Sequence, residues 1–260
     1  MTGGVSLEDI APKLLLQIAN DFEEYVKKNR KIARLKRLVD AGEATYQDAY
    51  SFAVELAEAL SRAFTENLSS SVLPDGKLYY NIAKRIIYSM MQQDYEMICD
   101  YAVAVQEAIN NKNKINIKAV RPAINEDRIQ GIVDIVSGKD DYDKISYMLN
   151  EPVANFSQSI IDDLIRSNAD FQWKAGLEPM IVRRSTGTCC DWCDKIAGTY
   201  KYQKVSNQGN NVFRRHKNCK CLIEYVCEKT AQNVHTKKYS SRIENPRQIE
   251  KETLDKIDNK

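Results

Sequence analysis

The stretch IYSMMQQDYEMICDYAVAVQEAI, residues 87–109, gives the clearest indication of the chain's architecture. Apolar residues recur there at steps of four, four, three, four, three and four: Ile87, Met91, Tyr95, Ile98, Ala102, Val105 and Ile109. This spacing lays one apolar stripe along an α-helix. The helix is predicted to end at NNKNK, residues 110–114, and to run for roughly 30 residues, or about 45 Å. Helices of this length pack side by side, so an antiparallel bundle is expected.

Further helices are predicted on both sides of this stretch. Ser6 and Asp9 resemble a capping box, and a helical stretch then runs to a stop near Ala41–Gly42. Its apolar stripe consists of Leu14, Ile18, Phe22 and Tyr25. Another helix starts at about Thr45, and a loop rich in turn residues follows at 67–77. Shorter helices are predicted at 126–138, 141–150 and 152–173.

Beyond Gly176 the helical period disappears. Short strands are predicted at 180–182, 198–203 and 221–228, with a loop at 206–211 between the last two. We therefore predict an α+β chain of three parts. These are a domain of long antiparallel helices at 1–175, a Cys/His module at 176–228, and a charged arm, extended or disordered, at 229–260.

The composition is that of an ordinary soluble protein. Of the 260 residues, 43% are hydrophobic and 28% are charged, and no apolar run approaches the ~18 residues that span a bilayer. The start of the chain lacks the basic region of a signal peptide, so we expect synthesis in the cytosol, with reduced cysteines. The net charge of +2 gives no sign of a nucleic-acid binder.

The cysteines are concentrated in one segment. Six of the seven lie between Cys189 and Cys227, in CCDWCDKIAGTY at 189–200 and in the region that begins FRRHKNCKC at 213–221. The pattern C-x2-C-x22-H-x2-C-x-C supplies the thiolate and imidazole ligands that zinc prefers. One structural zinc ion is predicted, with five candidates for four positions, and the choice between Cys219 and Cys221 is open. The candidates are Cys190, Cys193, His216, Cys219 and Cys221.

Other chemistries are open to the same residues. Small buried thiols can simply pack a pair of strands. The spacing of Cys190 and Cys193 also occurs in redox motifs, although those open a helix, and a strand is predicted at 198–203. A Cys–His nucleophile, or a nuclease using His216 and Asn218, would need partners that the sequence does not identify. No Gly-rich phosphate loop supports an ATPase, and the pairs Asp162–Asp163 and Asp140–Asp141 are interpreted as solvated.

Basic residues surround the segment. They can form a patch that contacts phosphates or an acidic partner, or they can simply solvate a small module. The residues are Arg183, Arg184, Arg214, Arg215, Lys217 and Lys220.

The same segment resembles the C-terminal signature of tailed-bacteriophage minor head proteins, the Mu F-like or head-morphogenesis family, in its Gram-positive phage form. In that form a cysteine pair around tryptophan precedes an Ala-Gly-x-Tyr turn and Arg-His-x-x-Cys-x-Cys. The similarity covers roughly 40 residues, and Asp191 replaces a common proline. The matching residues are Cys190, Trp192, Cys193, Ala197, Gly198, Tyr200, Arg215, His216, Cys219 and Cys221.

The resemblance implies a non-enzymatic component of the virion head, made in the host bacterial cytoplasm. Its implied partners are the portal or major capsid protein and, in addition, packaged DNA, with no membrane and no small-molecule substrate. The stretch after Cys221 is too short for the toxin or ADP-ribosyltransferase domain that some relatives carry. The alternatives are a zinc-dependent nucleic-acid-processing enzyme and a stand-alone DNA-binding module.

Overall fold

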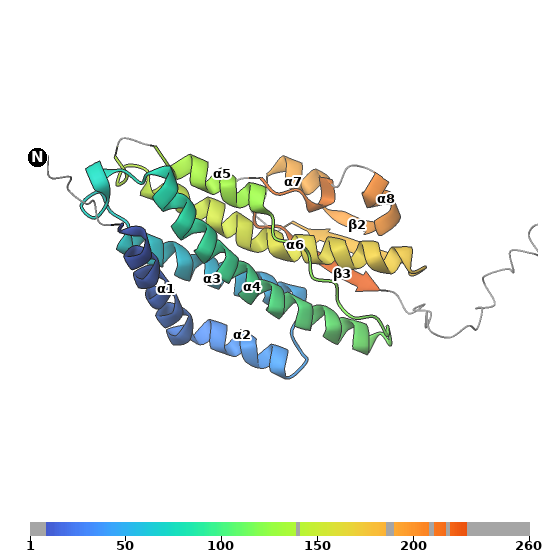
Figure 1. The fold of residues 1–260 in the computed structure, drawn as a ribbon. Helices are drawn as coiled ribbons and strands as arrows, with labels where there is room; N and C mark the ends of the chain where they lie inside the picture. The colour runs from blue at the N-terminus through green and yellow to red at the C-terminus, as the bar shows by residue number, and fades with distance from the viewer. Residues whose placement is uncertain (1–8, 139–140, 186–189, 208–210, 217–218, 228–260) are drawn as a thin grey trace, which may run out of the picture.

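The computed structural model describes residues 9–138, 141–185, 190–207, 211–216 and 219–227. It confirms the predicted class: a mainly helical region is followed by a small antiparallel sheet (Figure 1). The helical region consists of α1 (Ala11–Lys28), α2 (Arg30–Asp40), α3 (Tyr46–Asn67), η1 (Pro74–Gly76), α4 (Tyr80–Lys112), α5 (Glu126–Val136), η2 (Ser146–Leu149) and α6 (Asn150–Lys174).

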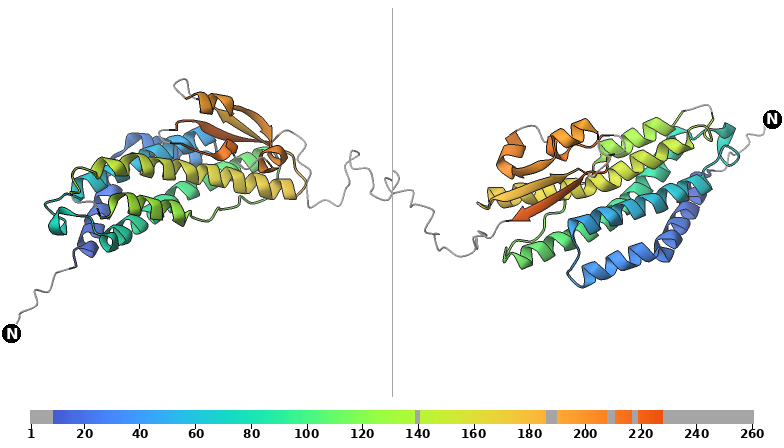
Figure 2. Two further views of the ribbon diagram at one scale, coloured as in Figure 1. Left: turned by 90° about the horizontal axis from the view of Figure 1, so that it is seen from above. Right: turned by 180° about the vertical axis from the view of Figure 1, so that it is seen from behind.

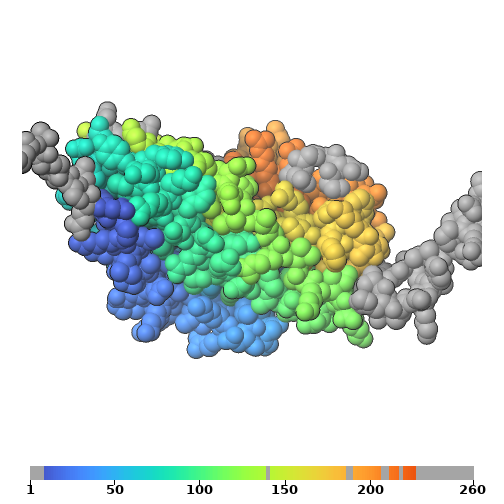
Figure 3. Space-filling view, viewed as in Figure 1, coloured from blue at the N-terminus to red at the C-terminus, as the bar shows by residue number. Residues whose placement is uncertain are grey.

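The long helices α3, α4 and α6 lie side by side and give the molecule an elongated body (Figures 1 and 3). Helix α3 runs in the opposite direction to α4 and α6, while α1 and α2 flank the body on one side and α5 on another. The predicted stripe of α4 faces this core: every member from Ile87 to Val105 is buried, and Ile109 is partly buried. The apolar spacing therefore identifies the helix and also the face that it packs.

The helical stretch predicted to end near Ala41–Gly42 is two helices. The backbone is extended at Asn29, whose side-chain oxygen accepts hydrogen bonds from the backbone of Lys31 at 2.8 Å and Ile32 at 3.1 Å. Asn29 thus ends α1 and caps α2. The predicted stop is confirmed by Gly42, which has a φ of +68°. Ser6 lies outside the described residues.

Two other predictions concern helix starts. Helix α3 begins where expected, because Thr45 and Asp48 form a reciprocal capping box. The prediction of a helix at 141–150 is wrong: only the single 3-10 turn η2 forms there, and α6 begins directly after it at Asn150. Residues 139–140 lie outside the described part of the chain.

The sheet has the strand order β2-β1-β3, with both pairs antiparallel. All three predicted strands are present, although β2 ends at Lys201 and the helix α8 takes the place of the end of the predicted strand at 198–203 and of the start of the predicted loop at 206–211. The short helix α7 was also not predicted. The elements are β1 (Pro179–Arg184), α7 (Asp191–Lys195), β2 (Gly198–Lys201), α8 (Tyr202–Asn207), η3 (Asn211–Phe213) and β3 (Leu222–Cys227).

One face of the sheet packs against α3 and α6 (Figure 2). Ile181 of β1 and Ile223 and Tyr225 of β3 are buried there and join the same apolar core as the helices. The Tyr225 hydroxyl also donates a hydrogen bond to the side chain of Gln172 in α6. The sheet is therefore held against the helices by a shared core, while the predicted arm at 229–260 lies outside the described residues. Among the described helices, none has the length and apolar character needed to cross a bilayer.

Candidate metal centre

The five predicted donors come together where α7, the segment after η3 and the start of β3 meet. Cys190 is the N-cap of α7 and Cys193 lies within that helix. His216 follows η3, and its carbonyl accepts a hydrogen bond from the backbone N–H of Cys219 at 3.1 Å. Cys221 immediately precedes β3. The sheet and the short helix thus bring together two groups of donors, one of two residues and one of three, that are more than twenty residues apart in sequence.

The donors form two triads that share one sulfur. Cys190, Cys193 and His216 make the first, and Cys193, Cys219 and Cys221 make the second, with all donor atoms of each triad within 4.8 Å of one another. The Cys193 Sγ lies 2.9 Å from His216 Nε2 and 3.9 Å from Cys219 Sγ. Ligand atoms on one tetrahedral zinc ion are about 3.5–3.8 Å apart, given the usual Zn–S and Zn–N lengths. The cluster can therefore hold a metal ion such as zinc, with Cys193 at its centre.

The cysteines of the cluster differ in burial and in acidity. Cys193, Cys219 and Cys221 are buried together, whereas Cys190 is exposed. Burial raises the pKa of the Cys193 thiol. Burial acts in the same direction on Cys219, but the backbone N–H of Cys221 and the nearby guanidinium groups outweigh it and lower the pKa of Cys219. A buried thiolate at Cys193 needs positive charge beside it, which a bound metal ion would supply.

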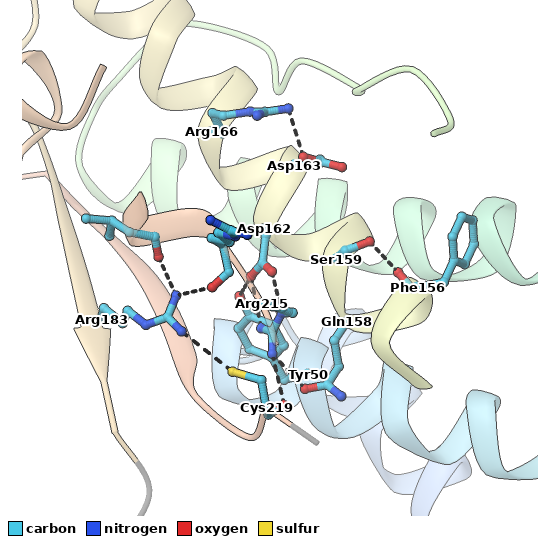
Figure 4. Close-up of polar contacts among 12 residues, drawn as sticks. Tyr50, Phe156, Gln158, Ser159, Asp162, Asp163, Arg166, Arg183, Arg215 and Cys219 are labelled. Carbon is cyan, nitrogen blue, oxygen red and sulfur yellow. Dashed lines mark hydrogen bonds and ion pairs between the residues drawn. The ribbon is translucent and has the colours of Figure 1, made fainter. Parts of the chain in front are cut away.

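Two side chains complete the walls of the site. The ring of Trp192 meets His216 edge-on, with ring centres 5.7 Å apart and planes at 82°. Arg183 of β1 directs its Nη2 at the sulfur of Cys193, 3.8 Å away, and at that of Cys219, 3.6 Å away. The contact with Cys219 can be followed in Figure 4.

Arg215, next to His216, fastens the site to the helical body. Its guanidinium donates two hydrogen bonds to the carboxylate of Asp162 in α6, with Nη2 3.0 Å from Oδ1. Its Nη1 reaches Gln158 Oε1 at 3.0 Å, and its plane lies over the ring of Tyr50 in α3, 5.1 Å from the centroid (Figure 4). The Tyr50 hydroxyl donates to Asp162 as well. Two helices therefore hold the residue that precedes a candidate ligand.

This ion pair is almost completely buried, with 2% of the Arg215 side chain and 3% of the Asp162 side chain exposed. Burial by itself lowers the pKa of Arg215, but the Asp162 carboxylate outweighs it and raises that pKa overall. Burial, and then Asp162, raises the pKa of Tyr50. Removing either member of such a pair is far more costly than breaking a surface ion pair.

The structure corrects the predicted basic patch. Arg183 is 2% exposed and the Arg215 side chain is turned inward, so neither can contact a nucleic acid or a partner. They are buried because the sulfurs, two carbonyls and Asp162 offer hydrogen-bond acceptors inside the protein. Of the remaining four, Arg184, Arg214 and Lys220 are exposed, with Arg184 paired to Glu224 at 2.9 Å. Lys217 lies outside the described residues.

The interpretation of Asp162 as solvated is also wrong, since it is 2% exposed and holds Arg215. A signal for this was present in the sequence. Asp162 follows Gln158 by four residues and precedes Ile165 by three, which places it on the buried side of α6. Its neighbour Asp163 is partly exposed and pairs with Arg166 at 2.9 Å.

The helix α7 bears on the redox alternative. The Cys190–Cys193 pair does open a helix, contrary to the prediction, but this helix ends at Lys195 and leads into β2. Cys193 belongs to both triads, with His216 in one and with Cys219 and Cys221 in the other, so its surroundings are those of a ligand cluster. The geometry therefore favours metal binding over a two-cysteine redox pair.

Comparison with models of known protein families, with curated protein sequences and with solved structures found no match for this chain.

Proposed function

We propose that this chain is a minor head protein of a tailed bacteriophage, with a non-enzymatic role in building the head. The observation that carries the proposal is the convergence of the residues behind the resemblance. Cys190, Cys193 and His216 form one triad and Cys193, Cys219 and Cys221 form a second, and the ring of Trp192 meets the imidazole edge-on. Arg215, another of the matching residues, anchors these triads to the helices. The residues that carry the resemblance therefore lie together in the fold, as is expected if they serve one site.

We further propose that the cluster binds a single zinc ion with a structural role. Protein donors outnumber the four positions of a tetrahedral ion, so a site filled by them leaves no open position for a substrate or water. The segment from β1 to β3 also has few large apolar residues of its own around the cysteines, which form a separate small buried cluster. A structural zinc ion contributes on the order of 10 kcal/mol to the folding of such modules.

The elongated helical body is the surface that we propose for contact with the portal or the major capsid protein. A nucleic-acid-binding role is the weaker alternative, because two of the six predicted basic residues are buried and a third is paired to Glu224. Among the described basic residues of the predicted patch, the exposed Arg214 and Lys220 are the ones that we propose for any contact with DNA.

The experiment that tests the proposal is quantitative mass spectrometry of purified phage particles from a host that carries the gene. We expect the chain in intact heads at a fixed, low ratio to the portal protein, together with loss of full heads when the gene is interrupted. A chain that is absent from purified particles, with normal head assembly without it, would rule the proposal out. Salt-dependent DNA binding by the purified chain, in the absence of any head association, would favour the alternative.

A further inference from the structure

Arg183 is among the largest fully buried side chains of the described residues, and none of the contacts seen for it is with a carboxylate. Its Nη1 donates hydrogen bonds to the carbonyl oxygens of Val212 and Arg214, the latter at 3.1 Å. Its Nη2 faces the two sulfurs described above, and Trp192 covers its plane with the ring centroid 5.6 Å away. Its Nε is buried without a hydrogen-bond partner among the described residues.

This environment poses a charge problem. A guanidinium stays ionised in a protein, and a buried charge without a counter-charge costs several kcal/mol. The charge of Arg215, another buried arginine of this region, is neutralised by its ion pair with Asp162. For Arg183 the described residues that could supply negative charge within reach are the sulfurs of Cys193 and Cys219.

We propose that Arg183 is a positioning residue of the metal centre, which donates N–H···S hydrogen bonds to the metal-bound thiolates of Cys193 and Cys219 and offsets their charge. The proposal rests on the metal site proposed above. A divalent ion with three thiolates and one neutral imidazole carries one net negative charge, which one guanidinium balances. Four thiolates would leave an excess charge in a buried site. Arg183 thus favours a ligand set that includes His216, completed by Cys190 or Cys221.

The geometry explains why the residue is an arginine. Its planar fork reaches two carbonyls on one side and two sulfurs on the other, whereas the ammonium of a lysine is a single point of charge. Because Arg183 lies on the central strand β1, these bonds also fix the position of the ligand loops relative to the sheet.

The test compares full-length wild-type protein with Arg183→Met, Arg183→Lys and the control Arg184→Met, an exposed neighbour on the same strand. Each is loaded with Co²⁺ for its thiolate-to-metal charge-transfer spectrum, and its zinc affinity is measured by competition with a chelator. We expect Arg183→Met to bind zinc about ten- to a hundredfold more weakly, as is usual when a partner of a metal ligand is lost. Its charge-transfer band should move to lower energy, because thiolates without donors are easier to oxidise.

Arg183→Lys should recover part of the affinity, and Arg184→Met should match the wild type. A folded Arg183→Met protein with wild-type affinity and an unshifted band would overturn the role of Arg183 while leaving the metal site intact. If the methionine variant does not fold, Arg183→Gln, which has no positive charge, takes its place, and wild-type affinity with an unshifted band in that variant would overturn the role equally. A wild-type chain that takes up neither Co²⁺ nor zinc would instead overturn the metal site itself, and this inference with it.

Discussion

Asn29 shows how one side chain can set the direction of the chain. Its amide oxygen caps α2 while its amide nitrogen donates to Glu55 Oε2 of α3 at 2.7 Å. Burial favours the neutral form of Glu55, but Lys31 and Asn29 outweigh it and lower the pKa of that carboxyl. The break between α1 and α2 is thus held in place by α3.

Replacing Asn29 by alanine removes the helix cap and the hydrogen bond to Glu55. We expect the free energy of unfolding to fall by about 1–2 kcal/mol, the usual cost of a lost helix cap and a lost partner of a buried carboxylate. Asn29→Ser keeps a capping oxygen and should cost less. Urea titrations of the two variants measure the difference, and equal stability of Asn29→Ala and the wild type would show that the break does not depend on this cap.

At the scale of elements, the Cys/His segment is attached to the helices by polar contacts as well as by apolar ones. Arg215 inserts between α3 and α6, where it contacts Tyr50, Gln158 and Asp162. The ligand His216 is the next residue. Metal binding and the docking of the sheet are therefore expected to support each other.

Arg215→Met leaves the Asp162 carboxylate buried without its counter-charge. We expect a loss of about 3–5 kcal/mol in the free energy of unfolding, because an uncompensated buried charge is expensive. The neighbouring exposed arginine gives the control, and Arg214→Met should change stability by no more than about 0.5 kcal/mol. Thermal unfolding of both variants measures the difference. Equal losses of stability in Arg215→Met and Arg214→Met would show that the buried ion pair stabilises the fold no more than an exposed arginine does.

Cys193→Ser removes the sulfur common to both triads. We expect loss of bound metal and of amide protection in residues 177–227, with the helices α3, α4 and α6 still protected in hydrogen exchange. Cys99→Ser is a matched change, because Cys99 is buried in α4 outside the cluster. It should keep its metal, and equal metal loss in both variants would contradict the assignment of the ligands.

At the scale of the whole molecule, stability should depend on pH through a carboxyl that the site does not use. Asp94 of α4 is fully buried, accepts a hydrogen bond from Ser157 of α6 at 2.6 Å, and has a second oxygen without a partner among the described residues. Burial raises its pKa to about 7. An unfolded aspartate has a pKa of about 3.9.

The sign follows from proton binding. Between these two pKa values the folded state keeps the proton on Asp94 and the unfolded state releases it. The contribution of Asp94 to the free energy of unfolding is therefore fully present below about pH 4 and is lost as the pH rises toward 7. From pH 5 to 8 the loss is about 3 kcal/mol as an upper bound. Asp94→Asn should remove this loss, whereas Asp100→Asn, on the exposed side of the same helix, should retain it. Urea titrations at pH 5 and pH 8 test this, and parallel curves for wild type and Asp94→Asn would contradict it.

The parts predicted from the sequence are those with a local signal. The spacing of apolar residues located α4 and its buried face, turn residues located the stop at Gly42, and the cysteine pattern located all five donors. The helix break at Asn29 and the inward turn of Arg183 and Arg215 were missed. Each of these depends on a partner distant in sequence: Glu55, the thiol sulfurs and Asp162. A charged residue beside a motif has no local feature that tells a buried counter-charge from a surface contact.

The converging cysteines and histidine are proposed to form one closed metal site. Elemental mass spectrometry of the purified full-length chain, after removal of loosely bound ions, tests this most directly. We predict about one zinc ion per chain, in keeping with a single tetrahedral site. A fully folded chain that contains no metal would contradict the claim.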